Sequence, residues 1–266
     1  MTAAPRLSAL VVARNEAAQL ADCLARLAFA DEIVVVLDRT TDGSVAIARA
    51  HGARLVEGAW ELEGPRRNAG IAACQGDWIL EVDADERVGD DLAREVRATI
   101  ATAPYGHFLV PFDNYVGDRL VRYGWGAAWG VSAAVRLFAR SAAEGPAKVW
   151  GDERVHPRLV LKGPQGRLAA RMMHYVDRDI SDMIARLDRY TTARAQDLRD
   201  SGDIGSLGRN VRRMFTRFWA CYVRRKGYRE GAWGVLIALM AALYPILSHL
   251  KARLEPARPR PTDGGA

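Results

Sequence analysis

Four carboxylates crowd the end of one apolar segment of the sequence. The stretch 76–88, GDWILEVDADERV, begins with residues that suit a buried strand and ends with Asp83, Asp85 and Glu86, with Glu81 just before them. Acidic residues in this place could cap a following helix. Like charges this close repel one another unless a cation joins them, and Asp-x-Asp offers the oxygen ligands that a divalent ion such as Mg²⁺ prefers. This segment alone leaves the helix cap and the metal site both open.

The surrounding sequence alternates between strands and helices. Apolar strands are predicted at Leu7–Ala13, Glu32–Asp38, 53–57 and Trp78–Asp83. Helical patterns are predicted at 16–29, 45–52, 64–76 and 89–102. Continuous apolar strands that alternate with helices indicate an α/β fold with a mainly parallel sheet covered on both faces.

Composition and charge limit the classes of protein that fit. The 266 residues are 49% hydrophobic, which is enough for one domain with a core, or one domain plus an appendage. The three cysteines are widely spaced and form no CxxC pattern, so we expect no disulfide and no zinc site, and a reducing cytoplasm. No basic region precedes the first apolar run, which we interpret as a strand and not as a signal peptide.

The positive charge is concentrated in the C-terminal part. Residues 201–266 contain 12 Lys or Arg against 4 Asp or Glu, whereas residues 1–200 carry a net charge of −2. A basic region of this kind suits a polyanion or an anionic membrane surface. We expect no nucleic-acid partner, because the basic residues alternate with long apolar runs.

An apolar segment at 231–247 follows a basic cluster. Its 17 residues lie at the lower limit for crossing a hydrocarbon core of about 30 Å, and Pro245 lies inside it. Arg224, Arg225, Lys226 and Arg229 precede it. We expect a helical, membrane-associating appendage at 201–255 that lies at the membrane interface, followed by a loose tail at 256–266. A soluble core or dimer helix and a true span are the alternatives.

Polar residues follow three of the predicted strands. Asn15 lies in "ARNE" after the first strand, Asp38 ends the second, and "DADE" follows the fourth. Asn15 could cap its helix and Asp38 could form a turn. Because ligands of such sheets bind beyond the carboxyl ends of the strands, their coincidence favours a binding site. No GxGxxG or GxxxxGK[ST] is present, which leaves a nucleotide site made of side chains and a metal-bound diphosphate.

The ordered set LSALVVARNE, ADEIVVVLDRTTDGS, RRNAG and GDWILEVDADERV resembles glycosyltransferase family 2, which has the Rossmann-like GT-A fold. The sequence is most similar to the branch that includes lipopolysaccharide inner-core β-1,4-glucosyltransferases. Residues 173–195 resemble that branch's His-Tyr segment and following helix, and residues 217–255 resemble its aromatic, Lys-Gly-aromatic and apolar C-terminal block. The resemblance covers most of residues 6–255.

The resemblance implies an activity and a domain organisation. It implies an inverting transferase that moves a hexose, most simply glucose, from a UDP-sugar to a lipopolysaccharide-core or other lipid-linked acceptor, with Mg²⁺ or Mn²⁺. The GT-A domain would comprise residues 1–200, with a nucleotide-sugar half at 6–102 and an acceptor half at 103–200. The protein would lie on the cytoplasmic face of the inner membrane.

The resemblance also implies roles for single residues. Asp38 would face the uracil or ribose, Asp83 would meet the ribose or the metal, and Asp85 would ligate the metal. Two further groups would contact the nucleotide-sugar: Ala13, Arg14, Asn15 and Glu16 along the diphosphate, and Arg67 and Asn68 beside them.

The expected catalytic base is where the sequence departs from the branch. Relatives have Val-His-Glu, whereas this chain reads GDERVHPRL, with Pro157 in the position of the glutamate. Glu153 and Asp152 are the nearby carboxylates that could accept the acceptor's proton, or both could be turn residues. His156 could be a third metal ligand or a core histidine. His174 is interpreted as structural or as a neighbour of the nucleotide.

Two other functions remain as alternatives. A phosphatase of the haloacid dehalogenase type also uses Asp-x-Asp at a strand end, but it needs Thr or Val where this chain has Arg87, and its pair follows the first strand. A membrane-bound scaffold that kept the fold without activity is the non-enzymatic alternative, because Pro157 removes the expected glutamate.

Overall fold

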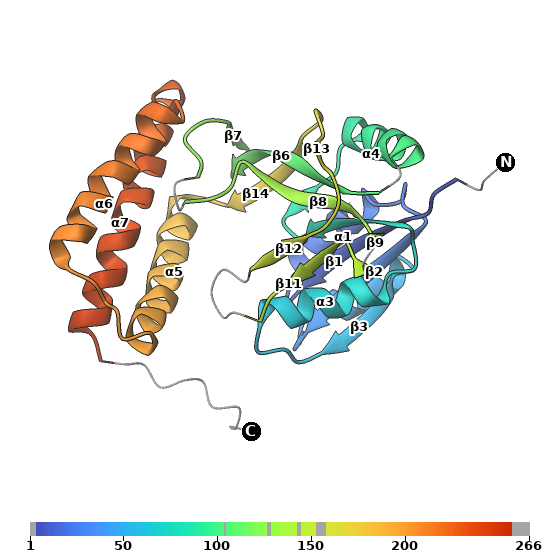
Figure 1. Cartoon of the computed structure of the whole chain (residues 1–266), viewed down its shortest axis with the longest axis horizontal. Coiled ribbons are helices and arrows are strands. Elements are labelled where there is room, and N and C mark those ends of the chain that lie inside the picture. The colour runs from blue at the N-terminus through green and yellow to red at the C-terminus, as the bar shows by residue number, and fades with distance from the viewer. Residues whose placement is uncertain (1–3, 104, 127–128, 143–144, 153–157, 257–266) are drawn as a thin grey trace. The chain divides into compact units, whose positions relative to one another are not determined.

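The computed structural model divides the chain into two compact units (Figure 1). It describes residues 4–103, 105–126, 129–142, 145–152 and 158–256. The first unit comprises Met1–Tyr115 with Ser132–Val176, and the second comprises Val116–Val131 with Asp177–Ala266. The expected boundary at residue 200 differs from this division, because the helix that ends there packs within the second unit.

The first unit is built on a mixed sheet with the strand order β3-β2-β1-β4-β8-β6-β14-β5. β13 also pairs with β6, outside this linear order of strands. The strands of this sheet, with the short pairs β9–β10 and β11–β12, are Leu7–Ala13 (β1), Glu32–Asp38 (β2), Arg54–Gly58 (β3), Trp78–Asp83 (β4), Glu86–Arg87 (β5), His107–Val116 (β6), Ala133–Ala139 (β8), Ser141–Ala142 (β9), Gly145–Pro146 (β10), Lys148–Trp150 (β11), Leu159–Leu161 (β12), Gln165–Arg167 (β13) and Met172–Asp177 (β14).

The four predicted strands are confirmed, and the third begins one residue later than predicted. All four pair in parallel, with β1 between β2 and β4. The sheet becomes mixed beyond them, because β8 pairs antiparallel with both β4 and β6. The mainly parallel arrangement therefore belongs to the first half of the chain.

Helices cover both faces of the parallel strands, as predicted. They are Ala17–Ala25 (α1), Ser44–Ala50 (α2), Glu63–Ala73 (α3) and Asp90–Thr102 (α4). Alternate strand residues enter two separate cores: Val11 packs in the core that includes α1 and α4, and Leu10 packs in the core that includes α3. α1 ends four residues before its predicted end, because the backbone N–H groups of Arg26 and Leu27 bond three residues back, which tightens the turn.

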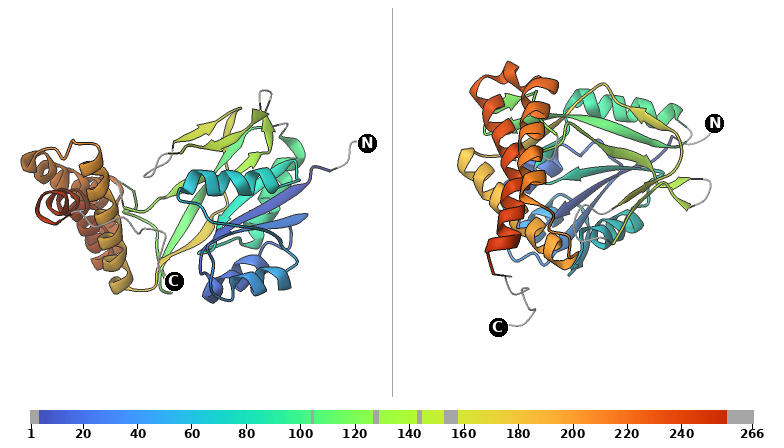
Figure 2. Two further views of the ribbon diagram at one scale, coloured as in Figure 1. Left: turned by 90° about the horizontal axis from the view of Figure 1, so that it is seen from below. Right: turned by 60° about the vertical axis from the view of Figure 1, so that its left-hand side comes forward.

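The second unit is mainly helical. Its elements are Arg119–Val121 (β7), Ile180–Asp200 (α5), Leu207–Trp219 (α6), a π-helical turn at Ala220–Arg224 (η1), a 3₁₀ turn at Gly227–Glu230 (η2) and Ala232–Leu254 (α7). α7 packs against both α5 and α6 (Figure 2). The predicted apolar helix is confirmed and continues beyond Pro245 to Leu254.

The first turn of α7 touches the backbone of η2. A Cβ atom on Gly234 would lie 1.8 Å from the carbonyl oxygen of Gly227, which is far inside van der Waals contact. Gly208 in α6 is the opposite case, since nothing lies within 4 Å of the place where its Cβ would be. Of these two glycines, Gly234 is therefore required by packing and Gly208 is not.

Gly234→Ala should lower the free energy of unfolding of the helical unit by about 1–3 kcal/mol, because the added methyl group forces α7 away from η2. Gly208→Ala is the matched control. It should be neutral or slightly stabilising, because alanine favours a helix over glycine by up to about 1 kcal/mol. Urea denaturation followed by far-ultraviolet circular dichroism measures both changes. Equal denaturation midpoints for the two variants would contradict the packing role of Gly234.

Candidate functional site

The carboxyl ends of β1, β2 and β4 lie together at one edge of the sheet. In the parallel registers, Ala13 pairs with Leu37 and Val12 pairs with Asp83. The polar residues that follow these strands are therefore neighbours, as the sequence predicted. Asp83 ends β4, Asp85 lies in the turn that follows, and Glu86 is the first residue of β5.

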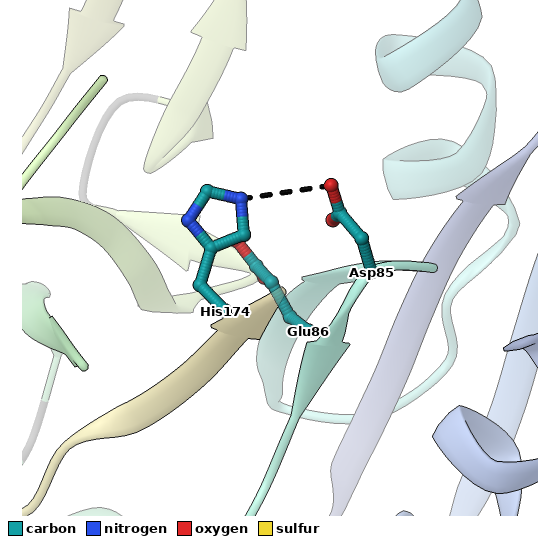
Figure 3. Close-up of side chains that lie close together, drawn as sticks. All are labelled: Asp85, Glu86 and His174. Atoms are coloured by element: carbon teal, nitrogen blue, oxygen red, sulfur yellow. Dashed lines mark ion pairs between the residues drawn. The ribbon is translucent and has the colours of Figure 1, made fainter. Parts of the chain in front are cut away.

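Asp85, Glu86 and His174 form a cluster that could hold a metal ion (Figure 3). One ligand atom from each residue lies within 4.8 Å of the others. The pairing of β5 with β14 creates the cluster, because it sets His174 opposite Glu86. The backbone N–H of Tyr175 also donates to the carbonyl oxygen of Asp85, at 2.9 Å. The turn after β4 is thereby fixed to a strand almost ninety residues later in the chain.

A hydrogen bond orients the imidazole of His174. Its Nδ1 lies 2.8 Å from Oδ1 of the buried Asn114. An amide oxygen can only accept, so Nδ1 carries the hydrogen and Nε2 keeps its lone pair in the neutral ring. Nε2 faces Asp85 Oδ2 at 3.6 Å. Two ligands of one octahedral ion, each about 2.1 Å from it, lie about 3.0 to 4.2 Å apart, so this spacing fits a shared ion.

Asp83 is held differently from Asp85. Its Oδ1 lies 3.0 Å from Nη2 of Arg67, and its Oδ2 pairs with Nη2 of Arg136. Burial would raise the pKa of Asp83, but the charges of Arg136 and Arg67 outweigh burial and hold it well below its usual range. Asp83 is thus an ionised partner of two arginines and lies outside the cluster of Asp85, Glu86 and His174. Its predicted contact with the ribose or the metal stays a prediction.

Glu86 connects the two sets of residues. Its side chain is fully buried, its Oε2 accepts from the backbone N–H of Asp83 at 2.9 Å, and its Oε1 pairs with Arg136. Burial raises the pKa of Glu86 to about 7, and the nearby Asp83 and Asp85 charges act in the same direction against Arg136. A bound cation would favour the ionised form of this carboxyl group.

A network of buried charges supports this edge from below. Glu81 faces the interior in the middle of β4 and pairs with Arg67 and with Lys148, which is itself buried on β11. Burial would raise the pKa of Glu81, but Lys148 and Arg67 hold it at about 2. Lys148 also donates to the carbonyl oxygen of Val135 at 2.8 Å. Three cations therefore neutralise the carboxylates along β4 and the turn.

Arg67 and Asn68 are occupied by protein groups. The buried guanidinium of Arg67 pairs with Glu63 as well as with Glu81 and Asp83. The side-chain amide of Asn68 makes two bonds with the backbone of Trp150, donating to its carbonyl oxygen at 2.7 Å and accepting from its N–H at 3.0 Å. The structure thus gives both residues a positioning role, and their predicted contact with a nucleotide-sugar stays a prediction.

The residues after β1 and β2 form tight, polar loops. Asn15 and Arg39 both have positive φ, at 58° and 47°, and Asn15 Oδ1 accepts from the backbone N–H of Thr41 at 2.8 Å. Such backbone strain in non-glycine residues is common at functional sites. Glu16 donates its backbone N–H to Ser44 Oγ at 3.0 Å. Burial, with the charges of Asp85, Asp42 and Asp83, raises the pKa of Glu16 against the effect of its bond from Gln19.

The other predicted residues of this edge have distinct surroundings. Asp38 is buried, and its carboxylate accepts from the backbone N–H of Trp60 and pairs with Arg39 and Arg66. Burial would raise the pKa of Asp38, but these partners hold it below its usual value. Ala13 is buried at the end of β1, whereas Arg14 is exposed.

Of the residues predicted as base or third metal ligand, the structure describes only Asp152. Asp152 is exposed after β11. Glu153 and His156 lie outside the described residues, as does Pro157. Their predicted roles therefore stay predictions.

Sequence reasoning did not bring together all the residues of this site. A helix cap was left open for the acidic residues after the fourth strand, Glu86 among them, and His174 was interpreted as structural or as a neighbour of the nucleotide, yet both lie beside Asp85. Arg136 and Lys148 sit singly in short apolar segments, and a charged residue inside a buried strand is the signal that could have indicated them. Arg87 was noted only because it stands where a phosphatase of the haloacid dehalogenase type needs Thr or Val. In the structure it donates to the carbonyl oxygens of Ala84 and Gln19, at 2.8 and 3.1 Å, and so fixes the turn.

Comparisons with known proteins point to one family. The model of glycosyl transferase family 2 matches residues 8–129. The chain is 25% identical over 257 residues to LpsC, a lipopolysaccharide core biosynthesis glycosyltransferase of Rhizobium meliloti, a match that covers 92% of this chain and 91% of that protein. It is 24% identical over 262 residues to an uncharacterized glycosyltransferase of Rickettsia felis, covering 93% of this chain and 89% of that one.

A solved structure shows a more limited similarity. Glucosyl-3-phosphoglycerate synthase from Mycobacterium tuberculosis, in complex with Mn²⁺, uridine diphosphate and glucosyl-3-phosphoglycerate, is 22% identical. The match covers 42% of this chain and 44% of that chain, with a TM-score of 0.36.

Arg136→Met should lower the free energy of unfolding by about 3–5 kcal/mol, because it leaves the fully buried Glu86 without its cation and leaves Asp83 with Arg67 alone. Arg140→Met is the matched control, since Arg140 is exposed just beyond the same strand, β8, and should change stability by less than about 0.5 kcal/mol. Chemical denaturation at neutral pH measures both. Equal stability of the two variants would contradict the network.

Binding of Mn²⁺ should weaken as the pH falls. The pKa of Glu86 is raised to about 7 and that of His174 is raised above its usual value, because the hydrogen bond and charge of Asp85 outweigh burial of the ring. Protons therefore compete with the metal below these pKa values and are absent above them. Titration calorimetry should give at least tenfold weaker binding at about pH 6 than at about pH 8, with proton release on binding. Equal affinity at the two pH values would contradict this metal site.

Proposed function

We propose that this chain, which belongs to glycosyltransferase family 2, moves a hexose from a UDP-sugar to a lipid-linked glycan. Members of this family are enzymes that use a nucleotide sugar. Glucose is the simplest choice of hexose. The lipopolysaccharide core is the proposed acceptor, because the name of the Rhizobium relative refers to core biosynthesis. The transfer inverts the configuration of the anomeric carbon.

The arrangement of Asp85, Glu86 and His174 at the strand edge is the observation that supports this function best. Two carboxylates and one oriented imidazole make a donor set for a single divalent ion. Their carboxylate oxygens suit Mg²⁺ and Mn²⁺, and the imidazole nitrogen favours Mn²⁺ of the two. When bound, such an ion neutralises the negative charge that develops on a departing diphosphate.

The residues around the cluster have separate tasks in this proposal. Asn114 holds His174 in the tautomer that presents Nε2. Arg136 and Arg67 keep Asp83 ionised and fixed beside the turn, where it faces the ribose. The loops at Asn15 and Asp38 receive the diphosphate and the uridine. The site is then preorganised before the sugar arrives, which is how enzymes gain most from electrostatic stabilisation.

The acceptor hydroxyl attacks the anomeric carbon while the bond to the diphosphate oxygen breaks. The hydroxyl loses its proton to a carboxylate, and the diphosphate leaves with the bonding electron pair. Glu153 is the proposed base and Asp152 its alternative, because both precede Pro157, which replaces the glutamate of related enzymes. The alternative of a phosphatase is set aside, since the family match and the position of the pair after the fourth strand both oppose it.

Purified protein should release UDP from one UDP-hexose in a panel of nucleotide sugars, and only when Mn²⁺ or Mg²⁺ is present. Asp85→Ala should lower this turnover at least a hundredfold while the protein stays folded, because Asp85 is partly exposed and outside the core. A coupled assay for released UDP measures the rate. Full activity in EDTA, or in Asp85→Ala, would overturn the metal-dependent mechanism.

Glu153→Gln and Asp152→Asn serve as a matched pair in the same assay with acceptor present. Glu153→Gln should lower kcat strongly with little change in binding of the UDP-sugar, since it removes the proposed proton acceptor and keeps the shape of the side chain. Asp152→Asn should remain near the original rate. If neither variant slows transfer more than a few-fold, His156 is the next candidate for the base.

We propose that the protein lies on the cytoplasmic face of the membrane that holds its acceptor. By length and composition, α7 could cross a membrane, because its most apolar 18-residue stretch has a mean hydropathy of 1.7. Half of that stretch, however, is buried within the structure. The basic residues Arg224, Arg225, Lys226 and Arg229 are exposed before it. Partial burial of the helix favours attachment at the interface over a true span.

The protein should sediment with vesicles that contain anionic phospholipid, and high salt should release part of it. Each basic residue near such a surface contributes about 1 kcal/mol, and salt screens that attraction. Replacing Arg224, Arg225 and Lys226 together by Gln should reduce sedimentation at low salt. Protein that stays in the supernatant with anionic vesicles at low salt would instead make α7 a core or dimer helix.

A further inference from the structure

The second unit contains a cavity walled by arginine side chains. The cavity has a volume of about 150 Å³ and lies among α5, α6, α7 and the loop before α6. Four guanidinium groups line it: Arg194 on α5, and Arg209, Arg213 and Arg217 on α6. Asp203 is the one carboxylate among the lining residues. At about 30 Å³ for each water molecule, the space would hold about five waters or one small hydrated anion.

The three arginines of α6 share one face of the helix. They are spaced four residues apart, so their side chains follow one another along the same side. Like charges at this spacing destabilise a helix. Asn210, which is 5% exposed, lines the same cavity, as do Tyr244 and Ser248 of α7. Asn210 and Ser248 already donate to the backbone carbonyl oxygens of Ser206 and Tyr244, so the arginines give the cavity its excess of positive charge.

The guanidinium groups of α6 lack anionic partners in the part of the chain that the structure describes. Arg209, Arg213 and Arg217 make no ion pair within 4.0 Å there, and Arg217 Nη1 is buried without a hydrogen-bond acceptor. Arg217 instead lies over the ring of Tyr244, at 5.4 Å from its centre. Arg194 lies 3.7 Å from Asp197, a long contact for an ion pair.

This arrangement is costly for the protein alone. Burial lowers the pKa of Arg217, and the charges of Arg213 and Arg194 act in the same direction. A buried donor without an acceptor and neighbouring charges of the same sign both destabilise the fold unless an anion joins them. Planar guanidinium groups match the oxygens of a phosphate group with paired hydrogen bonds.

We propose that this cavity is an anion site that binds a phosphate or diphosphate group. The group could belong to a soluble phosphate ester or to the headgroup of a phospholipid, which offer the same oxygens. The site consists only of residues of the second unit, whereas the metal cluster consists only of residues of the first. It requires neither a metal ion nor a sugar, and so does not depend on the proposed transferase reaction.

Titration calorimetry of the full chain with inorganic pyrophosphate tests the site. EDTA keeps divalent ions out of the metal cluster, and low salt limits screening. Arg217→Gln and Arg213→Gln should each weaken binding at least tenfold. Arg212→Gln is the matched control, because Arg212 is exposed on the same helix and does not line the cavity, and its change should stay within about twofold. Arg213 is also exposed, so its variant tests the site even if Arg217→Gln fails to fold.

Vesicles distinguish the two sources of the group. Sedimentation with phosphatidic acid in phosphatidylcholine, compared between Arg213→Gln and Arg212→Gln, shows whether a lipid headgroup enters. A greater loss for Arg213→Gln indicates the lipid headgroup, and equal losses indicate a soluble phosphate ester. The proposal is overturned if pyrophosphate binds equally to the original chain, Arg213→Gln and Arg212→Gln, or does not bind at all.

Discussion

A strand that ends in several carboxylates can be buried only if cations neutralise them, and this constraint determines how the first unit is built. Glu81, Asp83 and Glu86 lie on or just after β4; Glu81 and Glu86 are fully buried, Asp83 is partly buried, and each is paired with a cation. Arg67, Arg136 and Lys148 supply the charges. An unpaired carboxylate in such a place would lose several kcal/mol of hydration, so each needs its cationic partner in the folded structure.

The network also explains why the residues of the site are so well placed. Arg136 holds Asp83 and Glu86 with one guanidinium group, which fixes the turn that carries Asp85 between them. β14 then brings His174 beside Asp85, and Asn114 selects its tautomer. Buried charges thus cost stability in one part of the fold and provide a fixed set of ligands in another, which is common at functional sites.

Local patterns predicted the first half of the fold and the edge where the site lies. Each of the first four strands is a short apolar run that ends in a polar residue, and their parallel order follows from the helices between them. Asp85 could be singled out because the Asp-x-Asp spacing by itself offers oxygen ligands to a divalent ion. His174 and Arg136 could not, because they reach the site through antiparallel pairing of strands distant in sequence, and no local rule gives that pairing. Asn114 and Lys148 could not either, because each contacts a side chain more than fifty residues away in the sequence. The ion pairs of Arg67 with Glu81 and Asp83 were not predicted either, because they depend on how α3 packs on the sheet; its contact with a nucleotide-sugar, which the resemblance implies, stays a prediction.

We infer that Asp85 and His174 ligate one divalent ion at the carboxyl edge of the sheet. Anomalous diffraction from crystals grown with Mn²⁺ and UDP would locate this ion without reference to activity. We expect one strong peak about 2.0–2.4 Å from an oxygen of Asp85 and from Nε2 of His174, with diphosphate oxygens completing the shell. A strong Mn²⁺ peak that contacts neither residue would contradict it.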